Sequence, residues 1–168
     1  MPARALLVLL IVVTAALSPF PAAAEPSSPV VVALWQAPLD GALTVTRPFD
    51  PPPDPYGAGH RGVDLGGAPG VLVRAAGDGL VVFVGMVAGR PVVSLDHADG
   101  LRTTYEPVAP AVAAGQRVAR GSPIGTLNAG HAGCPVEACL HWGLRRGEAY
   151  LDPLALLRPP RIRLLPIG

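Results

Sequence analysis

The sequence contains no lysine, and arginine supplies all 13 of its basic side chains. Acidic residues number 12, so the formal net charge at pH 7 is only +1 and offers little attraction for a nucleic-acid backbone. Aromatic residues make up just 5% of the chain, and they do not alternate with basic residues as in a base-stacking surface. We therefore expect no nucleic-acid partner.

The N-terminal apolar run is too short for a transmembrane helix. It covers residues 5–17, whereas a membrane span needs ~20 residues. Arg4 precedes the run and the small residues Ala22, Ala23 and Ala24 follow it, which is the pattern of a signal peptide. We expect residues 1–24 to be a signal peptide cleaved after Ala24, and the mature chain to be secreted to the cell envelope without stable membrane insertion. An uncleaved anchor is the alternative.

The rest of the sequence predicts a Pro-rich linker at residues 25–40 and one all-β domain at residues 41–168. Twenty glycines and 21 prolines disfavour long helices and favour tight turns. Runs rich in β-branched residues predict strands, with turn residues at 88–90 and 99–100 between the first three. These runs are 80–85, 91–96, 101–105, 118, 123–127 and 140–145. We expect a compact antiparallel β-sandwich-like core of many short strands and turns.

One short C-terminal segment, residues 151–157, predicts a helix. Asp152 is suited to cap it, and Pro153 fits the first helical position because the fixed φ of proline suits that site.

Two short motifs carry the residues most suited to chemistry. His60 and Asp64 are four residues apart, and Gly62 between them would let the chain turn so that both side chains converge. His141 follows Cys139 by two residues in a predicted strand, so these two side chains should share a face. Two imidazoles and a carboxylate form a three-ligand catalytic zinc set with the fourth position left for water.

The sequence from about residue 44 to residue 157 resembles the lysostaphin-type zinc metallopeptidases, bacterial cell-wall endopeptidases with HxxxD and HxH motifs, as a divergent member. The stretches that carry this resemblance are 60–65, 73–79, 118–125, His141 and 152–154. It implies a groove for peptidoglycan stem peptides or cross-bridges, with Zn²⁺ held by His60, Asp64 and His141. It also implies that Tyr105 lines this groove.

Two departures from the family pattern concern catalysis. Cys139 stands where the HxH motif has its first, catalytic histidine, and Pro107 stands where a Tyr-x-His motif has another. Loss of such proton-transfer groups costs ~10²–10⁴-fold each. The remaining catalytic candidates are Tyr105, Cys139 and His131. His131 lies in a Gly-rich loop and either reaches the site as a substitute base or is an exposed loop residue. We expect Glu106 to point away from the site.

Cys134 and Cys139 enclose four residues, and in an exported protein this spacing favours a disulfide. The alternative is that Cys139 binds zinc as a thiolate and closes the coordination sphere, which would make the site structural. A disulfide leaves an open zinc position. His97, beside a hairpin turn, is expected to be structural.

The leading hypothesis is an exported zinc metalloendopeptidase that acts on peptidoglycan peptides, with the usual catalytic histidines replaced. The alternative is a catalytically weakened zinc-binding domain that binds cell-wall peptide or regulates a partner hydrolase. A zinc-stabilised structural module is a third interpretation.

Overall fold

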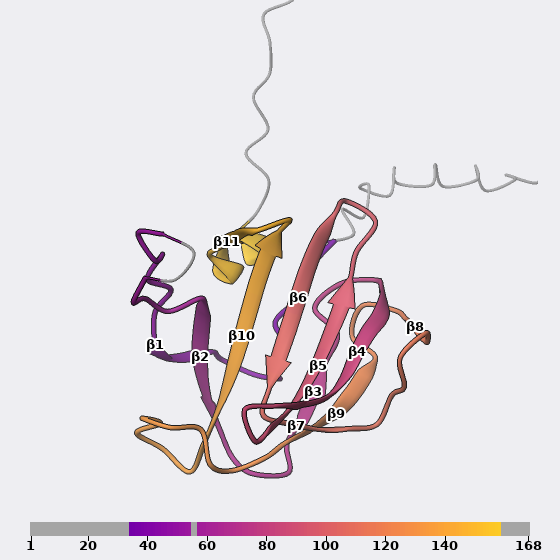
Figure 1. Ribbon diagram of the computed structural model, residues 1–168. Coiled ribbons are helices and arrows are strands. Elements are labelled where there is room, and N and C mark those ends of the chain that lie inside the picture. Colours follow the sequence, from indigo (N-terminus) through magenta and orange to yellow (C-terminus); the bar gives the residue numbers. More distant parts are fainter. Residues whose placement is uncertain (1–33, 55–56, 159–168) are drawn as a thin grey trace, which may run out of the picture. The chain divides into compact units, whose positions relative to one another are not determined.

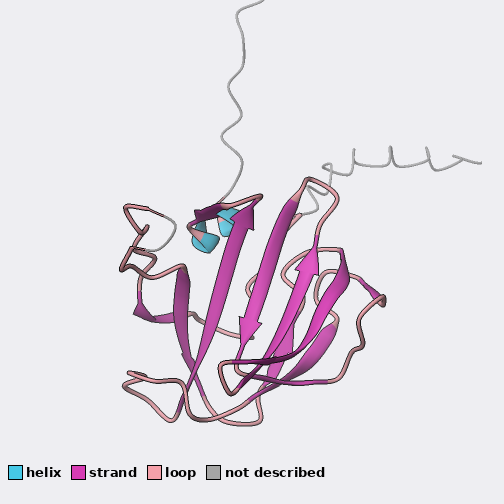
Figure 2. Ribbon diagram, in the orientation of Figure 1, coloured by secondary structure: helices cyan, strands magenta, loops and turns pink. Residues whose placement is uncertain are grey.

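Eleven strands and one short 3₁₀ helix make up the part of the chain that the structure, a computed structural model, describes: residues 34–54 and 57–158. The predicted signal peptide lies outside these residues. The strands form two antiparallel sheets, and the predicted all-β class is confirmed (Figure 2). Their bounds are β1 (Thr44–Arg47), β2 (Gly62–Gly67), β3 (Leu72–Arg74), β4 (Gly79–Val87), β5 (Arg90–Asp96), β6 (Leu101–Glu106), β7 (Val108–Pro110), β8 (Arg117–Val118), β9 (Pro123–Leu127), β10 (Ala138–Arg146) and β11 (Ala149–Leu151).

The larger sheet has the strand order β1-β2-β10-β6-β5-β4-β8, and β11 pairs with β10 (Figure 1). Two of its hairpins end in the predicted turns. Ala88 and Gly89 have φ values of 47° and 80°, and Gly100 has a φ of 76°, so each turn uses left-handed backbone that glycine adopts readily. This sheet brings β2 and β10, far apart in sequence, into direct register.

The smaller sheet, β3-β9-β7, contacts one face of the larger sheet through β7 with β5 and β9 with β10. Side chains from both sheets form a single core, with Trp142, Tyr105, Leu65, Ile124 and Leu127 among its largest fully buried members. Side chains alternate between the two faces of a strand. Alternate residues of β2, β10 and β6 therefore project from the opposite face of the larger sheet, and the candidate site lies on that face.

The described part of the predicted linker packs against the domain. The backbone N–H of Gln36 donates to Ala76 O at 2.8 Å, Leu39 is buried, and the ring of Trp35 lies 4.7 Å from that of His97. His97 itself is held between Asp78 O and Thr103 Oγ1, both at 2.8 Å, in the structural role expected of it. Residues 34–40 thus extend the folded domain on the side of His97.

The C-terminal helix, η1 (Pro153–Leu157), is a 3₁₀ helix that starts as predicted. Asp152 Oδ1 accepts a hydrogen bond from Leu154 N at 3.0 Å, and Pro153 occupies the first turn. None of the helical structure in residues 34–54 and 57–158 has the length and apolar character needed to cross a membrane.

Candidate metal centre

Strand register brings the three predicted ligands together. Asp64 in β2 lies directly opposite His141 in β10. Residues opposite each other in an antiparallel pair project from the same face with Cβ atoms ~5 Å apart, so these two side chains are neighbours. His60 lies two residues before β2, where its backbone forms an isolated bridge with Asp50 that turns its side chain toward the same point.

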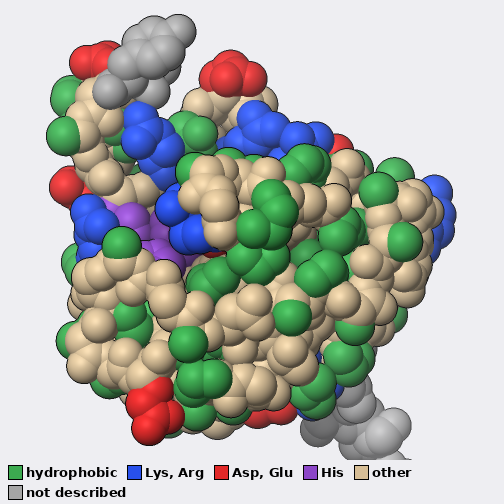
Figure 3. Space-filling view, turned by 60° about the horizontal axis from the view of Figure 1, so that its bottom comes forward, with side chains coloured by type: hydrophobic (Ala, Val, Ile, Leu, Met, Phe, Trp, Pro, Cys, Tyr) green, Lys and Arg blue, Asp and Glu red, His purple; other side chains and the backbone are tan. Residues whose placement is uncertain are grey.

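The three ligand atoms form a nearly equilateral triangle. His60 Nε2 lies 2.9 Å from Asp64 Oδ1 and 3.0 Å from His141 Nδ1, and His141 Nδ1 lies 2.9 Å from Asp64 Oδ1. His60 and Asp64 are buried and His141 is half-buried. Figure 3 shows histidine side chains at the bottom of a hollow that arginine side chains flank.

The hydrogen bonds of the site leave two of its ligand atoms, His60 Nε2 and Asp64 Oδ1, with lone pairs. A backbone carbonyl can only accept, so the 2.7 Å contact of His60 Nδ1 with Pro48 O fixes the ring proton on Nδ1 and leaves Nε2 free to coordinate. Burial by itself would raise the pKa of Asp64. The hydrogen bond to His141 and the electrostatic interactions with His131, His60 and His141 outweigh burial, so the pKa of Asp64 lies below its ordinary value. The carboxylate is therefore ionised at neutral pH.

This donor set fits zinc. His60 Nε2 and Asp64 Oδ1 both present lone pairs at 2.9 Å, and a shared cation would relieve their repulsion. A tetrahedral zinc with ligand bonds of ~2.0–2.1 Å would need ligand atoms roughly 3.3 Å apart, a small expansion of the observed triangle. His60, Asp64 and His141 are also the His/Cys/Asp/Glu group in the described residues whose ligand atoms converge closely enough to hold a metal ion.

Gly62 makes the close packing of His141 possible. A Cβ at this position would lie 2.5 Å from Trp142 O and 2.8 Å from both Cε1 and Nε2 of His141. The sequence predicted that Gly62 allows a turn between His60 and Asp64. The structure shows a different reason. Gly62 is the first residue of β2, and the imidazole of His141 occupies the space that a Cβ at residue 62 would need.

His131 lies at the site, and the interpretation of an exposed loop residue is wrong. Its Nε2 is 3.5 Å from Asp64 Oδ1, and its ring is nearly parallel to that of His141 with centroids 6.1 Å apart. The His131 side chain is only 12% exposed. Its Nδ1 is buried and has no hydrogen-bond partner within the described residues.

Tyr105 does not line the groove. It is fully buried in the core, where its hydroxyl accepts hydrogen bonds from Ala76 N and Thr103 Oγ1, both at 2.9 Å. Burial raises the pKa of Tyr105 to about 12 despite these hydrogen bonds, so the phenol stays protonated at neutral pH. The prediction of Tyr105 as a catalytic or groove residue is therefore wrong. The strand alternation that buries Leu101, Thr103 and Tyr105 also buries this hydroxyl.

Glu106 was predicted to point away from the site, and this prediction is wrong. It lies directly opposite His141, so it shares the face of the metal site. Its carboxylate forms an ion pair with Arg90. Both residues line a pocket of about 300 Å³ over the metal site, together with Arg47, His60, His131, Ala132 and His141. Because Tyr105 points into the core, the next residue must point to the site.

Cys139 forms a disulfide with Cys134, as favoured from the sequence. Free cysteines are absent from the described residues, so a thiolate ligand to zinc and a catalytic thiol at Cys139 are both excluded. Cys139 does share the site face of β10, and Thr46 Oγ1 lies 3.4 Å from its sulfur. The disulfide ties the loop that carries His131 to the strand that carries His141.

Replacing both cysteines with serine is expected to lower the free energy of unfolding by about 2 kcal/mol, because the cross-link closes a short loop in the unfolded chain. Urea denaturation of the variant, and of the native chain with and without reductant, measures this difference. The reduced native chain should unfold at the same urea concentration as the variant. Equal midpoints for the oxidised and reduced native chain would contradict the expectation.

Two antiparallel sheets that gather two imidazoles and a carboxylate around one point are the arrangement expected of a metallopeptidase domain. Residues 58–153 match peptidase family M23, so the chain belongs to this family. The resemblance to lysostaphin-type metallopeptidases is confirmed.

The uncharacterized protein Rv2891 of Mycobacterium tuberculosis is 53% identical over 135 residues, which cover 78% of this chain and 54% of that protein. The chain thus spans about half the length of this curated relative.

Solved structures share the fold. Csd3 of Helicobacter pylori superposes with a TM-score of 0.63 at 26% identity, over 79% of this chain and 37% of that chain. A zinc-containing peptidase of Vibrio cholerae gives a TM-score of 0.62 at 25% identity, over 77% and 40%. The catalytic domain of the prophage-encoded M23 protein EnpA of Enterococcus faecalis gives 0.56 at 26% identity, over 70% and 94%.

Proposed function

We propose that this protein is an exported zinc endopeptidase that cleaves peptide bonds in peptidoglycan stem peptides or cross-bridges. The observation that carries the proposal is the triangle of His60 Nε2, Asp64 Oδ1 and His141 Nδ1, which opens onto a pocket of about 300 Å³. Membership of family M23 and the similarity to a zinc-containing peptidase support it. The signal-peptide pattern of residues 1–24 supports export.

Zinc at these three ligands would polarise a peptide carbonyl and lower the pKa of a bound water. The chain's own residues would then supply proton transfer and positioning. His131 Nε2 lies 3.5 Å from Asp64 Oδ1, beside the metal site, where the imidazole would take a proton from the attacking water and return it to the leaving amine. The Glu106 carboxylate and the Arg90 guanidinium, held by one another across the pocket, would orient the substrate backbone as acceptor and donor.

The direct test is cleavage of purified peptidoglycan by the mature chain, followed by separation of the released peptides. Cleavage should require zinc, stop when a chelator is added and return when zinc is restored. Amine groups released in step with zinc occupancy would identify peptide-bond hydrolysis. No zinc-dependent release at high protein concentration would reject the enzymatic function.

Substituting His131 with alanine is expected to lower kcat by ~100-fold while zinc affinity changes little, because His131 transfers protons and is not one of the three ligands. Added imidazole should restore part of the lost activity. Val136→Ala is the matched control, since Val136 lies exposed in the same loop. A loss of zinc affinity as large as the loss of activity would show that His131 acts through the metal site, and an unchanged kcat would remove it from the mechanism.

The second candidate is a zinc-binding domain that binds cell-wall peptide, or regulates a partner hydrolase, without efficient cleavage. Its motivation is that a disulfide-bonded Cys139 and Pro107 occupy the positions of the two histidines expected from the family pattern. Zinc-dependent binding of peptidoglycan peptide without cleavage would select this function over the first.

A further inference from the structure

A groove continues from the metal site along the open face of the larger sheet. Its volume is about 350 Å³, and it shares His141 and Glu106 with the pocket over the metal site. Its other lining residues include Arg61, Arg102, Thr104, Gly143, Arg145 and Tyr150. The groove is thus a second compartment of the same site.

The register of the strands explains the shape of this groove. One step along the sheet from His141 and Glu106, the cross-strand row contains Gly62, Gly143 and Thr104. Because two of these residues are glycine and the third is the small threonine, the surface beside the metal site is recessed and forms the floor of the groove. One step further, the row contains Arg145, with Arg102 and Tyr150 as its two cross-strand neighbours. The side chains of Arg102 and Arg145 therefore bound the groove at the end away from the metal site.

The spacing between the metal site and the arginines suits an extended peptide. His141 and Arg145 are four residues apart in β10, a distance of ~13 Å at the rise of a β-strand. An extended peptide has nearly the same rise per residue. A substrate group held by Arg145 would lie about four residues from the bond over the metal site.

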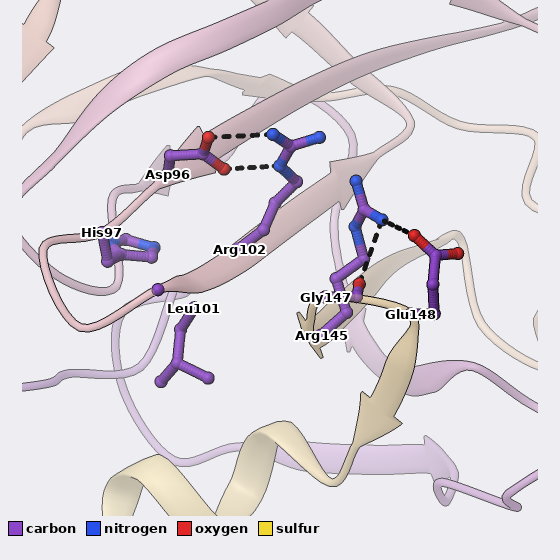
Figure 4. Close-up of a pocket in the computed structure, with 8 residues that line it drawn as sticks. Asp96, His97, Leu101, Arg102, Arg145, Gly147 and Glu148 are labelled. Atoms are coloured by element: carbon purple, nitrogen blue, oxygen red, sulfur yellow. Dashed lines mark hydrogen bonds and ion pairs between the residues drawn. The ribbon is translucent and has the colours of Figure 1, made fainter.

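The guanidinium of Arg145 is held by weak contacts and by the electrostatic attraction of nearby Asp96, so it can exchange these partners for an anion. Its Nη1 donates to Gly147 O at 3.2 Å, and its ion pair within the described residues is a 3.9 Å contact with Glu148, whose side chain is fully exposed (Figure 4). Exposed ion pairs of this kind contribute little and are readily exchanged. Neighbouring Arg102 is bound by both carboxylate oxygens of Asp96, at 2.5 and 2.8 Å, so its charge is largely matched.

Arg61 forms the rim of the groove beside Tyr150. Its guanidinium lies 5.4 Å from the centroid of the Tyr150 ring, in a cation–π contact, and donates to Gly57 O at 3.2 Å. These contacts fix its position beside the floor. A planar guanidinium held in place loses little freedom when it binds a carboxylate, which favours recognition of that group.

We propose that the groove binds an extended peptide and that Arg145, with Arg61 at the rim, holds a free carboxylate on that peptide about four residues from the bond over the metal site. This inference rests on the proposed function and deepens it, because it assigns the substrate class: peptides with a carboxylate at that distance. Peptides in which the carboxylate is an amide lack the charge that Arg145 and Arg61 recognise.

The test is direct binding of a matched pair of synthetic stem peptides to the zinc-loaded mature chain. The two peptides are identical except that their carboxyl groups are free in one and carboxamides in the other. The free-acid peptide should bind at least ~10-fold more tightly, because hydrogen bonds to charged partners are the stronger ones. This preference should shrink as the salt concentration rises.

Arg145→Gln should reduce the preference to near parity, and Arg145→Lys should keep part of it. Arg146→Gln is the matched control, because Arg146 is the next residue of β10 and projects from the opposite face. Equal affinity of the native chain for both peptides would overturn the inference, as would an equal loss in the Arg145→Gln and Arg146→Gln variants. Because binding is measured, a preference without cleavage would reject only the proposed endopeptidase, and cleavage without a preference would reject only the carboxylate subsite.

Discussion

Substituting Asp64 with asparagine is expected to weaken zinc binding by at least ~100-fold and to reduce cleavage to the level of the zinc-free chain. Loss of a partner that merely orients a ligand already costs ~10–100-fold in metal affinity, and Asp64 is itself a ligand candidate. The amide keeps the shape of the carboxylate but loses the charge that holds His60 and His141 around one point. Competition with a chromogenic chelator measures the affinity, and peptide release measures the activity.

The control for this variant is Glu137→Gln, which removes one exposed carboxylate from the loop before β10 and changes the net charge equally. It should bind zinc like the native chain. The circular dichroism spectrum of the Asp64→Asn chain should match that of the zinc-free native chain, so that loss of metal is not confused with loss of fold. Zinc affinity within threefold of the native value would contradict the assignment of Asp64 as a ligand.

Substituting Gly62 with alanine is expected to lower the free energy of unfolding by about 3 kcal/mol and to weaken zinc binding at the same time. The new methyl group would lie 2.5 Å from the backbone oxygen of Trp142 and 2.8 Å from two ring atoms of His141. Overpacking of this kind costs about 1–3 kcal/mol, and occasionally more. The backbone oxygen cannot move without separating β2 from β10, so the imidazole and the strand pair must both shift.

Gly143 offers the matched control, because it is the cross-strand partner of Gly62. A Cβ at Gly143 would meet its nearest neighbours at 3.6 Å, which is ordinary van der Waals contact. Gly143→Ala should therefore unfold at nearly the native urea concentration and keep its zinc. Equal stability of the two variants would show that the approach of His141 does not depend on the missing side chain at Gly62.

All six runs predicted as strands from the sequence are strands in the structure, whereas β1, β2, β3, β7 and β11 were not predicted. The runs at 80–85, 91–96, 101–105, 118, 123–127 and 140–145 correspond to β4, β5, β6, β8, β9 and β10, with hairpin turns where glycine predicted them. Strand β2 was missed because its Gly62, Gly66 and Gly67 weaken the propensity signal. Its pairing with β10 depends on packing across the sheet and not on local preference.

The candidate ligands were predictable because His60, Asp64 and His141 form a recognisable pattern, but the residues around them were less so. Tyr105 was assigned to the groove from a family motif, although the alternation of Leu101, Thr103 and Tyr105 favours the core. Because Tyr105 was assigned to the groove, Glu106 was predicted to point away from the site, which was also wrong. The placement of His131 had no periodic signal, because its loop has no regular structure.

The convergence of His60 and His141, which are 81 residues apart in sequence, ties the metal site to the folding of the whole sheet. An unfolded chain holds these ligands at no fixed distance, so zinc would bind the native state far more tightly than the unfolded ensemble. By mass action, free zinc at 100 times its dissociation constant would then add ~2.7 kcal/mol to the stability of the domain. Zinc supply in the surroundings would thus set how long the domain resists unfolding and proteolysis.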